Sequence, residues 1–334
     1  MRRMAVALPV LGGVLICLMV LSLGIGPVSV EPSRVADILL ALNLDDESTE
    51  AEAIIVRTIR PPRVLLAVLV GALLSLSGAV MQGLFQNPMA DPYVVGVSSG
   101  AALGATIALS LSLEVWLWGI HSVSLFAFVG ALGVTLLVYG ISVRGGKVPV
   151  SVLLLTGVAI GSLAAALTSF LMMMSNQNLH RILYWLLGGL ASRRWEHVQM
   201  VWPYALVGVV VLQVFARDLN LLLQGEESAQ HLGVNVERVK LLLLGTAALL
   251  TAAAVAVSGI VGFVGLLVPH IMRLLVGPDH RRLLPASALG GAILVVGADI
   301  LARTVIAPAE IPLGVITSML GCPFFLFLLH RRRL

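Results

Sequence analysis

The feature that most constrains this chain is a series of ten apolar runs, each about long enough to cross a bilayer as a helix, which takes roughly 20 residues. Inside a bilayer, only helices and closed barrels satisfy their own backbone hydrogen bonds. Barrel strands are segments of roughly ten residues with alternating polarity, whereas these runs are continuously apolar and about twice as long. We therefore expect an all-α polytopic membrane protein with about ten transmembrane helices. The runs cover residues 6–28, 62–85, 92–112, 121–142, 150–174, 197–215, 237–258, 260–276, 284–303 and 311–330.

The overall composition agrees with a chain that lies mostly in lipid. Of its 334 residues, 59% are hydrophobic and 11% are charged, whereas a soluble domain carries about 25% charged residues. No half of the chain is polar enough to form a soluble domain, so residues 1–334 are expected to form a single transmembrane domain. The basic residues behind the net charge of +4 are distributed according to the two sides of the membrane, so this charge does not predict a nucleic-acid partner.

The lysines and arginines are divided unevenly between the two sides of the membrane that ten spans would create. Cytoplasmic loops are enriched in these residues. With the N-terminus inside, the inside segments hold 13 of the 21 and the outside segments hold 8. This count predicts that both termini are cytoplasmic and that the acidic stretch "LNLDDESTEAEAIIV" is an outside loop.

The sequence lacks the motifs of a nucleotide-binding or catalytic protein. Gly145, Gly146 and Lys147 lack the flanking pattern of a P-loop, and the sequence has no H-E-x-x-H, C-x-x-C or G-x-S-x-G motif. Cys17 and Cys322 lie in separate apolar runs and predict neither a disulfide nor a metal site. We therefore expect a non-enzyme that binds no cofactor itself.

A polar break, "QNPMADP", separates the second and third runs. Pro88 disfavours helical geometry at Asn87, and Asp91 followed by Pro92 is typical of the start of a helix. Beyond the break, glycines recur every four residues over 96–104, a spacing that lets another helix approach closely. The break is predicted to be a tight cytoplasmic turn.

One carboxylate, Asp299 in "GADILAR", lies inside a predicted span. An ionised carboxylate there costs about 2.5–3.5 kcal/mol on insertion scales. Arg303 follows four residues later on the same helix face, so a structural pair is the favoured interpretation. The alternative is an ion-coupled carrier that uses Asp299. Such a carrier would need inverted repeats and further midplane ligands, which the sequence does not clearly show.

The segment over about 219–236 is the most informative cytoplasmic loop. In "GEESAQHLGVN", the two glutamates suit the first turn of a helix, the second glycine suits its C-terminal end, and the asparagine suits the cap of the next helix. We expect a short helix over 226–232 at the inner membrane surface, with Ala229 and Leu232 available to a partner.

With these features in view, the chain resembles the FecCD-type permease family, the membrane subunits of ABC importers for iron-siderophores, haem and vitamin B12. The resemblance extends from the second run to the last and is carried by six ordered blocks. These are "IRPPRVLLAVLVGALLSLSGAVMQGLFQNPMADPYVVGVSSGAALGA", "LYWLLGGL", "GEESAQHLGV", "GIVGFVGLLVPHIMRLL", "DHRRLLP" and "ADILARTVIAPAEIPLGVITSMLGCPFFLFLL".

The resemblance implies a type II ABC importer permease fold in the cytoplasmic membrane of a bacterium or archaeon. The implied assembly is a homodimer with the transport pathway at its two-fold axis, above two ATP-binding-cassette subunits that hold ATP and Mg. A periplasmic or lipid-anchored binding protein would deliver the metal chelate. Which chelate is carried is left open by the sequence.

The resemblance also assigns three sets of residues. The cytoplasmic gate would comprise Asn87, Met89, Val150 and Ser151. The contact with the ATPase would comprise Gly225, Glu226, Glu227, Ser228, Ala229, His231, Leu232, Gly233 and Val234. Docking of the binding protein, through its glutamates, would use Arg60, Arg63 and Arg303, because arginines form bidentate pairs with carboxylates.

Overall fold

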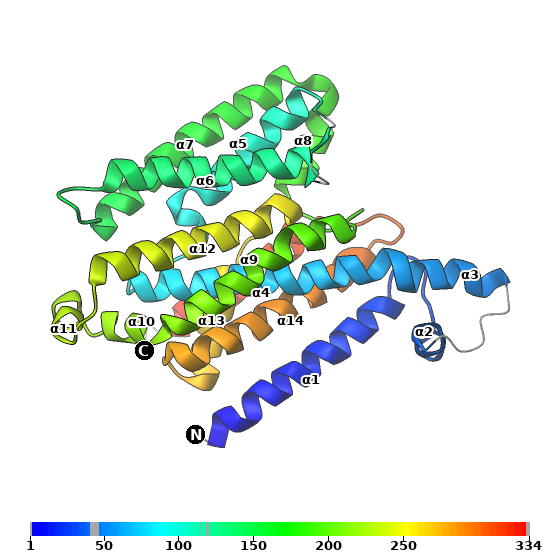
Figure 1. Cartoon of the computed structure of the whole chain (residues 1–334). Helices are drawn as coiled ribbons and strands as arrows, with labels where there is room; N and C mark the ends of the chain where they lie inside the picture. Colours follow the sequence, from blue (N-terminus) through cyan, green and yellow to red (C-terminus); the bar gives the residue numbers. More distant parts are fainter. Residues whose placement is uncertain (1, 41–46, 114, 118–119, 332–334) are drawn as a thin grey trace.

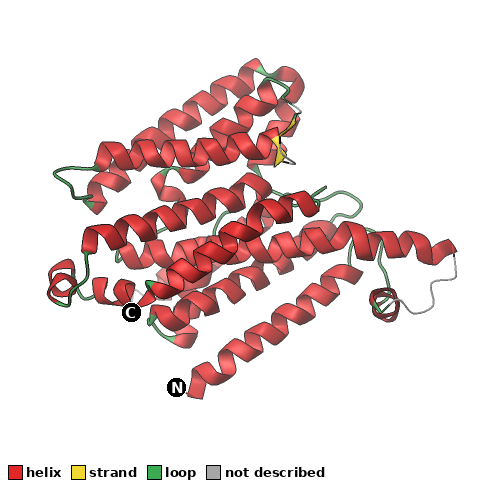
Figure 2. Ribbon diagram, viewed as in Figure 1, coloured by secondary structure: helices red, strands yellow, loops and turns green. Residues whose placement is uncertain are grey.

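The structure is a computed structural model that describes residues 2–40, 47–113, 115–117 and 120–331, and these residues are almost entirely helical (Figure 2). Each of the ten predicted runs corresponds to one apolar helix. These helices are α1 (Arg2–Gly24), α4 (Arg60–Leu84), α5 (Val97–Ser110), α6 (Ser122–Ser142), α7 (Val150–Met174), α9 (Trp195–Val214), α12 (Val236–Ser258), α13 (Val264–Val276), α14 (His280–Thr304) and α15 (Leu313–Arg331). Seven of them are long and apolar enough to cross a membrane, and α5, α13 and α15 have shorter apolar segments.

Short elements connect these helices. They are α2 (Pro32–Leu39), α3 (Glu47–Ile54), a π-helical turn (Ile55–Ile59), two 3₁₀ turns (Pro92–Val95 and Asn176–Asn178), α8 (Leu179–Leu186), α10 (Ala216–Leu222), α11 (Glu226–His231) and a small hairpin of β1 (Trp116–Leu117) and β2 (Ile120–His121). The helix α8 lies between the fifth and sixth apolar helices, α7 and α9.

Two predicted spans begin later than expected, and their irregular starts touch each other. The third begins as a helix at Val97 rather than at residue 92, and the eighth at Val264 rather than at residue 260. Gly96 and Phe263, just before these helices, have left-handed backbone angles that interrupt a helix. The hydroxyl of Tyr93 donates to the carbonyl oxygen of Val261 at 2.8 Å. The side chain of Tyr93 therefore satisfies a backbone carbonyl of the second interruption.

The second span extends further outward than the sequence predicted. The helix α3 continues through the π-helical turn into α4, so the predicted outside segment is helical from residue 47 onward. The stretch "ESTEAEAI" contains good helix formers in alternation with small residues, which favours a helix. Residues 41–46 of that predicted loop lie outside the described residues.

The helix α4 lies at the centre of the bundle, against α12, α13 and α14 (Figure 1). At two crossings the backbones approach so closely that only glycine fits. A Cβ on Gly71 would lie 2.2 Å from the carbonyl oxygen of Gly291 in α14, and one on Gly78 would lie 1.8 Å from that of Gly265 in α13. In lipid, where the hydrophobic effect does not hold helices together, such close contacts between small residues stabilise helix packing.

The helices α5, α6 and α7 form a second group beside this centre, together with α8 (Figure 1). The predicted glycine face is real at Gly100 and Gly104, since a Cβ on either would lie 2.3 Å or less from a backbone oxygen of α6. The outer faces of α7 remain exposed, with Leu155 71% and Val158 62% exposed. Such surfaces are suited to lipid or to another apolar subunit.

The bundle has two distinct ends. The helix α1 begins and α15 ends at the end that carries α11 (Figure 1), as ten spans with both termini on one side require. Following the charge count, we call this the inner end. The opposite end, where α4 begins and α14 finishes, is called the outer end.

Candidate functional site

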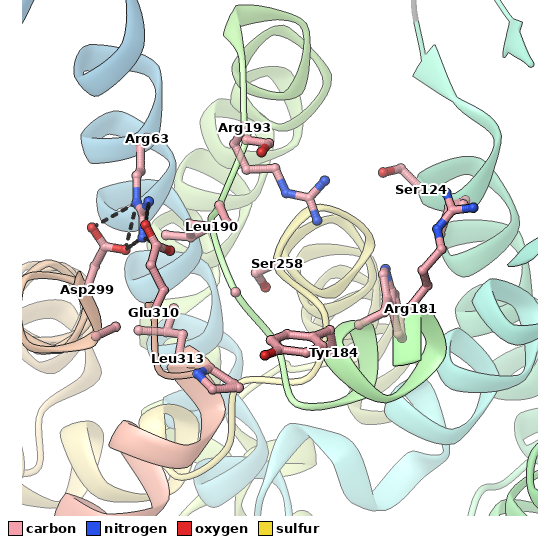
Figure 3. Close-up of a pocket in the computed structure, with 18 of the residues that line it drawn as sticks. Arg63, Ser124, Arg181, Tyr184, Leu190, Arg193, Ser258, Asp299, Glu310 and Leu313 are labelled. Atoms are coloured by element: carbon pink, nitrogen blue, oxygen red, sulfur yellow. Dashed lines mark hydrogen bonds and ion pairs between the residues drawn. The ribbon is translucent and has the colours of Figure 1, made fainter. Parts of the chain in front are cut away.

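The outer end contains a buried cluster of two arginines and two carboxylates, which we call the outer ion cluster: Arg63, Asp299, Arg303 and Glu310. Arg63, in the first turn of α4, donates to Asp299 at 2.9 Å and to Glu310 at 2.8 Å (Figure 3). Arg303 pairs with Asp299 at 3.1 Å, which confirms the predicted structural pair. Its two positive and two negative charges balance, as buried charges must.

All three predicted docking arginines are bound by groups of this chain, Arg63 by the two carboxylates described above. Arg60 is 5% exposed and donates to three backbone oxygens at the end of α1 and just after it. Arg303 is 2% exposed and donates to the hydroxyl oxygen of Ser22 at 2.6 Å. Arg63 has a side chain that is 11% exposed. These side chains fasten α1 to α4 and α14; their pairing with a binding protein is not tested by contacts within one chain and stays a prediction.

A cavity of about 470 Å³ opens beside the outer ion cluster. Arg63 and Glu310 lie on one side of it and Arg181 on the other, and the Arg193 guanidinium points into the space between them (Figure 3). Tyr184 of α8 forms part of the floor in this view. Arg193 could not be singled out from the sequence, because an arginine in "ASRRW" looks like an ordinary residue at the membrane surface.

At the inner end, the turn "QNPMADP" is tight, as predicted. Asn87 and Met89 are both exposed, and the side-chain oxygen of Asn87 accepts from the Met89 amide at 2.9 Å. Gln86 has a left-handed backbone angle, and its side-chain amide donates to the carbonyl oxygen of Leu222 in α10 at 2.9 Å. The turn is therefore fastened to the segment that leads into α11.

Asp91 ends this turn and caps the 3₁₀ turn after it, as predicted, by accepting from the Tyr93 amide at 2.8 Å. Burial raises the pKa of Asp91 to about 6, because desolvation outweighs this hydrogen bond. Among the described residues Asp91 has no ion-pair partner.

The second predicted gate segment lies at the start of α7. Ser151 is exposed, whereas Val150 is half-buried and lines a small cleft with Lys240. The start of α7 lies near the end of α4 just before the turn, since Val150 lines the same small cleft as Leu84 and Phe85. The structure thus places both segments at the inner end, although their role as a gate stays a prediction.

A short polar chain links the start of α7 to α11. The Val148 amide lies 3.4 Å from a carboxylate oxygen of Glu237, and Lys240 lies 3.7 Å from the other. Lys240 also forms an ion pair with Glu226 in the first turn of α11. We call Glu226, Lys240 and Glu237 the inner charge chain.

The predicted coupling helix exists as α11, and its boundaries agree with the prediction to within one residue. Gly233, in a left-handed conformation, terminates it, and the Asn235 side chain caps α12 by accepting from the Arg238 amide. Leu232 is 60% exposed, as expected, but Ala229 is fully buried, so the expectation that it faces a partner was wrong. Ala229 packs inward because a short helix also has a face toward its own protein.

The remaining assigned residues of this segment lie on the same surface. Exposed side chains or backbone are found at Glu226, Glu227, Ser228, His231 and Gly233, and half-buried ones at Gly225 and Val234. This surface is therefore open to contact from below the bundle, while its contact with an ATPase stays a prediction.

Two further polar contacts at the inner end were missed from the sequence. The Gln82 side chain donates to the Leu266 carbonyl oxygen at 3.0 Å and accepts from Arg273 at 3.0 Å, which joins α4 to α13. Asn220 donates to Asp279 at 2.6 Å, which joins α10 to the start of α14. Burial would raise the pKa of Asp279, but this hydrogen bond and nearby arginines lower it below its usual range. Such contacts join residues far apart in sequence and have no local signal.

Comparison with known proteins places these features in a family. The profile of the FecCD transport family matches residues 14–331. The cobalamin import system permease protein BtuC of Halobacterium salinarum is 50% identical over 283 residues, covering 85% of this chain and 75% of that protein. The hemin transport system permease protein HmuU of Yersinia pestis is 47% identical over 278 residues, covering 82% of this chain and 83% of that protein.

A solved structure has the same architecture. It is described as an inward-facing conformation of a metal-chelate type ABC transporter, and it matches with a TM-score of 0.85 and 32% sequence identity, covering 97% of this chain and 98% of that chain. The resemblance therefore includes the order and packing of the helices over nearly the whole chain.

Proposed function

The chain belongs to the FecCD transport family, and from this premise we propose that it is the transmembrane permease subunit of an ATP-driven importer for a metal chelate. Two copies would enclose the pathway at their interface, and alternating access would move the chelate from the periplasm to the cytoplasm. The observation that carries the proposal is the match over nearly the entire chain in both sequence and fold.

The family implies an ATPase and a substrate-binding protein as partners. We propose two ATP-binding-cassette subunits, which would bind ATP and Mg and hydrolyse the ATP, so that this chain needs no cofactor and no catalytic residue. The binding protein, soluble or lipid-anchored, would dock at the outer end. The membrane would be the cytoplasmic membrane of a bacterium or archaeon.

The contacts at the inner end support a route for coupling. Movement of an ATPase against α11 would act on the inner charge chain and so on the start of α7, where Val150 and Ser151 lie. It would act through α10 and Gln86 on the turn that carries Asn87 and Met89. The proposed ATPase surface is therefore linked to the turn through α10, and to the start of α7 through three successive contacts.

The geometry around Asp299 disfavours the alternative of an ion-coupled carrier. A residue that carries protons or cations must be released and bound again in each cycle. Asp299 is 1% exposed and is held by Arg63 at 2.9 Å and Arg303 at 3.1 Å. Both arginines that balance its charge therefore belong to this chain.

Reconstitution tests the proposal directly. Proteoliposomes would contain this chain and its ATPase, with ATP on the ATPase side and binding protein outside, loaded in turn with ferric siderophore, haem or cobalamin. We expect uptake that requires both ATP and one loaded binding protein. Uptake driven by an ion gradient without ATP would contradict the proposal and favour the carrier that uses Asp299.

A further inference from the structure

The outer cavity contains a guanidinium whose charge no carboxylate of the described chain balances. Arg193 lies in the segment between α8 and α9, and Nη1 of its side chain contacts Nε2 of His197 at 3.3 Å. Its Nε is buried and has no hydrogen-bond partner. Within residues 2–40, 47–113, 115–117 and 120–331, no carboxylate lies within ion-pair distance of Arg193.

The neighbouring Arg63 lines the same cavity and is balanced by carboxylates of this chain. Arg63 has two carboxylates, Asp299 and Glu310, within 3 Å. Arg193 shares the same cavity without such a partner, even though burial lowers its pKa to about 10 and it is protonated at neutral pH. A buried charge left unpaired is destabilising, so the Arg193 guanidinium is suited to an anion that enters the cavity.

The cavity is suited to part of a small molecule. Its volume of about 470 Å³ lies in the usual range of ligand pockets, roughly 300–1,000 Å³, and far exceeds one carboxylate side chain. Ser124 and Tyr184 add hydroxyl groups to its lining, and Trp185 adds an aromatic ring. Its walls therefore combine an unbalanced positive charge with weakly polar and aromatic surface.

We propose that Arg193 binds a carboxylate of the transported chelate as it enters the outer cavity, and hence that the cargo is an anionic, carboxylate-bearing metal chelate. The inference rests on the proposed function and narrows it. Guanidinium groups bind carboxylates in a bidentate, charge-assisted manner. With a cargo that has no carboxylates, no carboxylate of the cargo or of the described chain would balance Arg193.

The test measures binding of metal chelates to the purified chain with its ATPase in nanodiscs, by equilibrium dialysis. The probes are ferric citrate and haemin, which carry carboxylates, and ferrichrome and cyanocobalamin, which carry none that are ionised. We expect binding only by carboxylate-bearing probes, and a loss of about 10- to 100-fold in affinity in Arg193→Gln, as for one charge-assisted hydrogen bond. Haemin dimethyl ester, in which both carboxylates are blocked, should bind to the unaltered chain as weakly as haemin binds to Arg193→Gln.

Two variants separate charge recognition from damage to the fold. Arg193→Lys keeps the charge but loses the bidentate geometry, so it should lose less affinity than Arg193→Gln. Arg194→Gln removes a charge from the exposed neighbour that does not line the cavity and should change nothing. Equal binding by Arg193→Gln and Arg194→Gln, tighter binding of a neutral probe, or binding of no probe would overturn the proposal.

A carboxylate could also come from the binding protein. If Arg193→Gln weakened association of the ligand-free binding protein and left chelate binding unchanged, the Arg193 partner would be that protein and the proposal would be wrong. ATP-dependent uptake of a neutral chelate would overturn this inference while the proposed function stood. Absence of ATP-dependent uptake would instead count against the proposed function.

Discussion

Two buried or half-buried carboxylates, one at each end of the bundle, are held in opposite ways. Asp299 at the outer end is paired with Arg63 and Arg303, each at about 3 Å. Asp91 at the inner end has one backbone amide, that of Tyr93, and no ion-pair partner among the described residues. The charge of Asp299 is balanced by two guanidinium groups, whereas Asp91 is stabilised only by the dipole of one backbone N–H group.

The difference indicates which end of the molecule is built to stay fixed. At the outer end, Arg60 and Arg303 join α1, α4 and α14 through buried hydrogen bonds that would have to break together. At the inner end, the turn is fastened by single contacts such as that from Gln86 to Leu222. Elements that move in a transport cycle are expected among those with few buried contacts, so we expect movement at the inner end.

The largest effect is expected from opening the outer ion cluster. Arg303→Gln would leave Asp299 with one arginine and remove the contact with Ser22. Breaking a buried pair costs about 3–5 kcal/mol, so thermal unfolding in detergent should occur at a markedly lower temperature. The matched control is Arg144→Gln, at an exposed position, which should unfold like the original chain. If both variants unfolded alike, the outer cluster would not be the fixed end.

Much of this outer cluster could not have been predicted from the sequence. The pair of Asp299 and Arg303 was predictable because residues four apart share a helix face. The pair of Arg63 and Asp299 spans 236 residues, and only the packing of α4 on α14 brings them together. Burial of Arg60 and Arg303 follows from the same packing, so a single sequence gives no sign that they face inward.

The next effect is a pH dependence that should come from the inner turn. Burial raises the pKa of Asp91 to about 6, whereas an unfolded aspartate titrates near pH 4. Between these values Asp91 holds its proton in the folded chain and loses it in the unfolded chain, so the contribution of Asp91 to stability should fall as the pH rises from about 4 to 6 and then level off. At about 1.4 kcal/mol per pH unit, the fall is at most about 3 kcal/mol.

Asp91→Asn removes the titrating group and should flatten this part of the pH profile of unfolding. Asp218→Asn, which changes a carboxylate on α10, serves as the control and should leave the fall in place. A fall that persisted unchanged in Asp91→Asn would show that another group is responsible and that the two ends do not differ in this way.

At the inner end, the sequence predicted local features well and contacts with other segments poorly. The caps by Asp91 and Asn235 and the extent of α11 depend on neighbours within a few residues, and all were predicted. The burial of Ala229 depends on which side of α11 faces α10 and α12, which no local pattern specifies. The ten spans were predicted because length and hydrophobicity suffice, whereas the irregular starts of α5 and α13 depend on contacts between them.

A smaller effect on stability, with a larger one on coupling, is expected at Gln86. Gln86→Ala removes one hydrogen bond between the turn and Leu222, worth about 0.5–1.5 kcal/mol. In proteoliposomes the variant should keep its ATP hydrolysis but import less chelate per ATP, because movement of α10 no longer reaches the turn. Gln213→Ala removes a comparable bond to the Arg281 carbonyl oxygen, away from the turn, and should keep normal coupling. Equal losses in both variants would exclude the specific link.

The smallest effect is expected from the ion pair between Lys240 and Glu226. It tests how strongly the contacts at the inner end hold α11 to the bundle. The Glu226 side chain is 52% exposed, and exposed pairs contribute about 0–1 kcal/mol. A double-mutant cycle of Lys240→Gln and Glu226→Gln on the isolated chain should therefore give a coupling energy below about 1 kcal/mol that shrinks further in high salt. Glu227→Gln, in the same helix and without a described partner, should show no coupling to Lys240. A large, salt-independent coupling energy would mean that the inner end is held as firmly as the outer one, because strong coupling at this distance requires a pair shielded from water. A small one would leave α11 free to follow the ATPase, as the contrast between Asp299 and Asp91 requires.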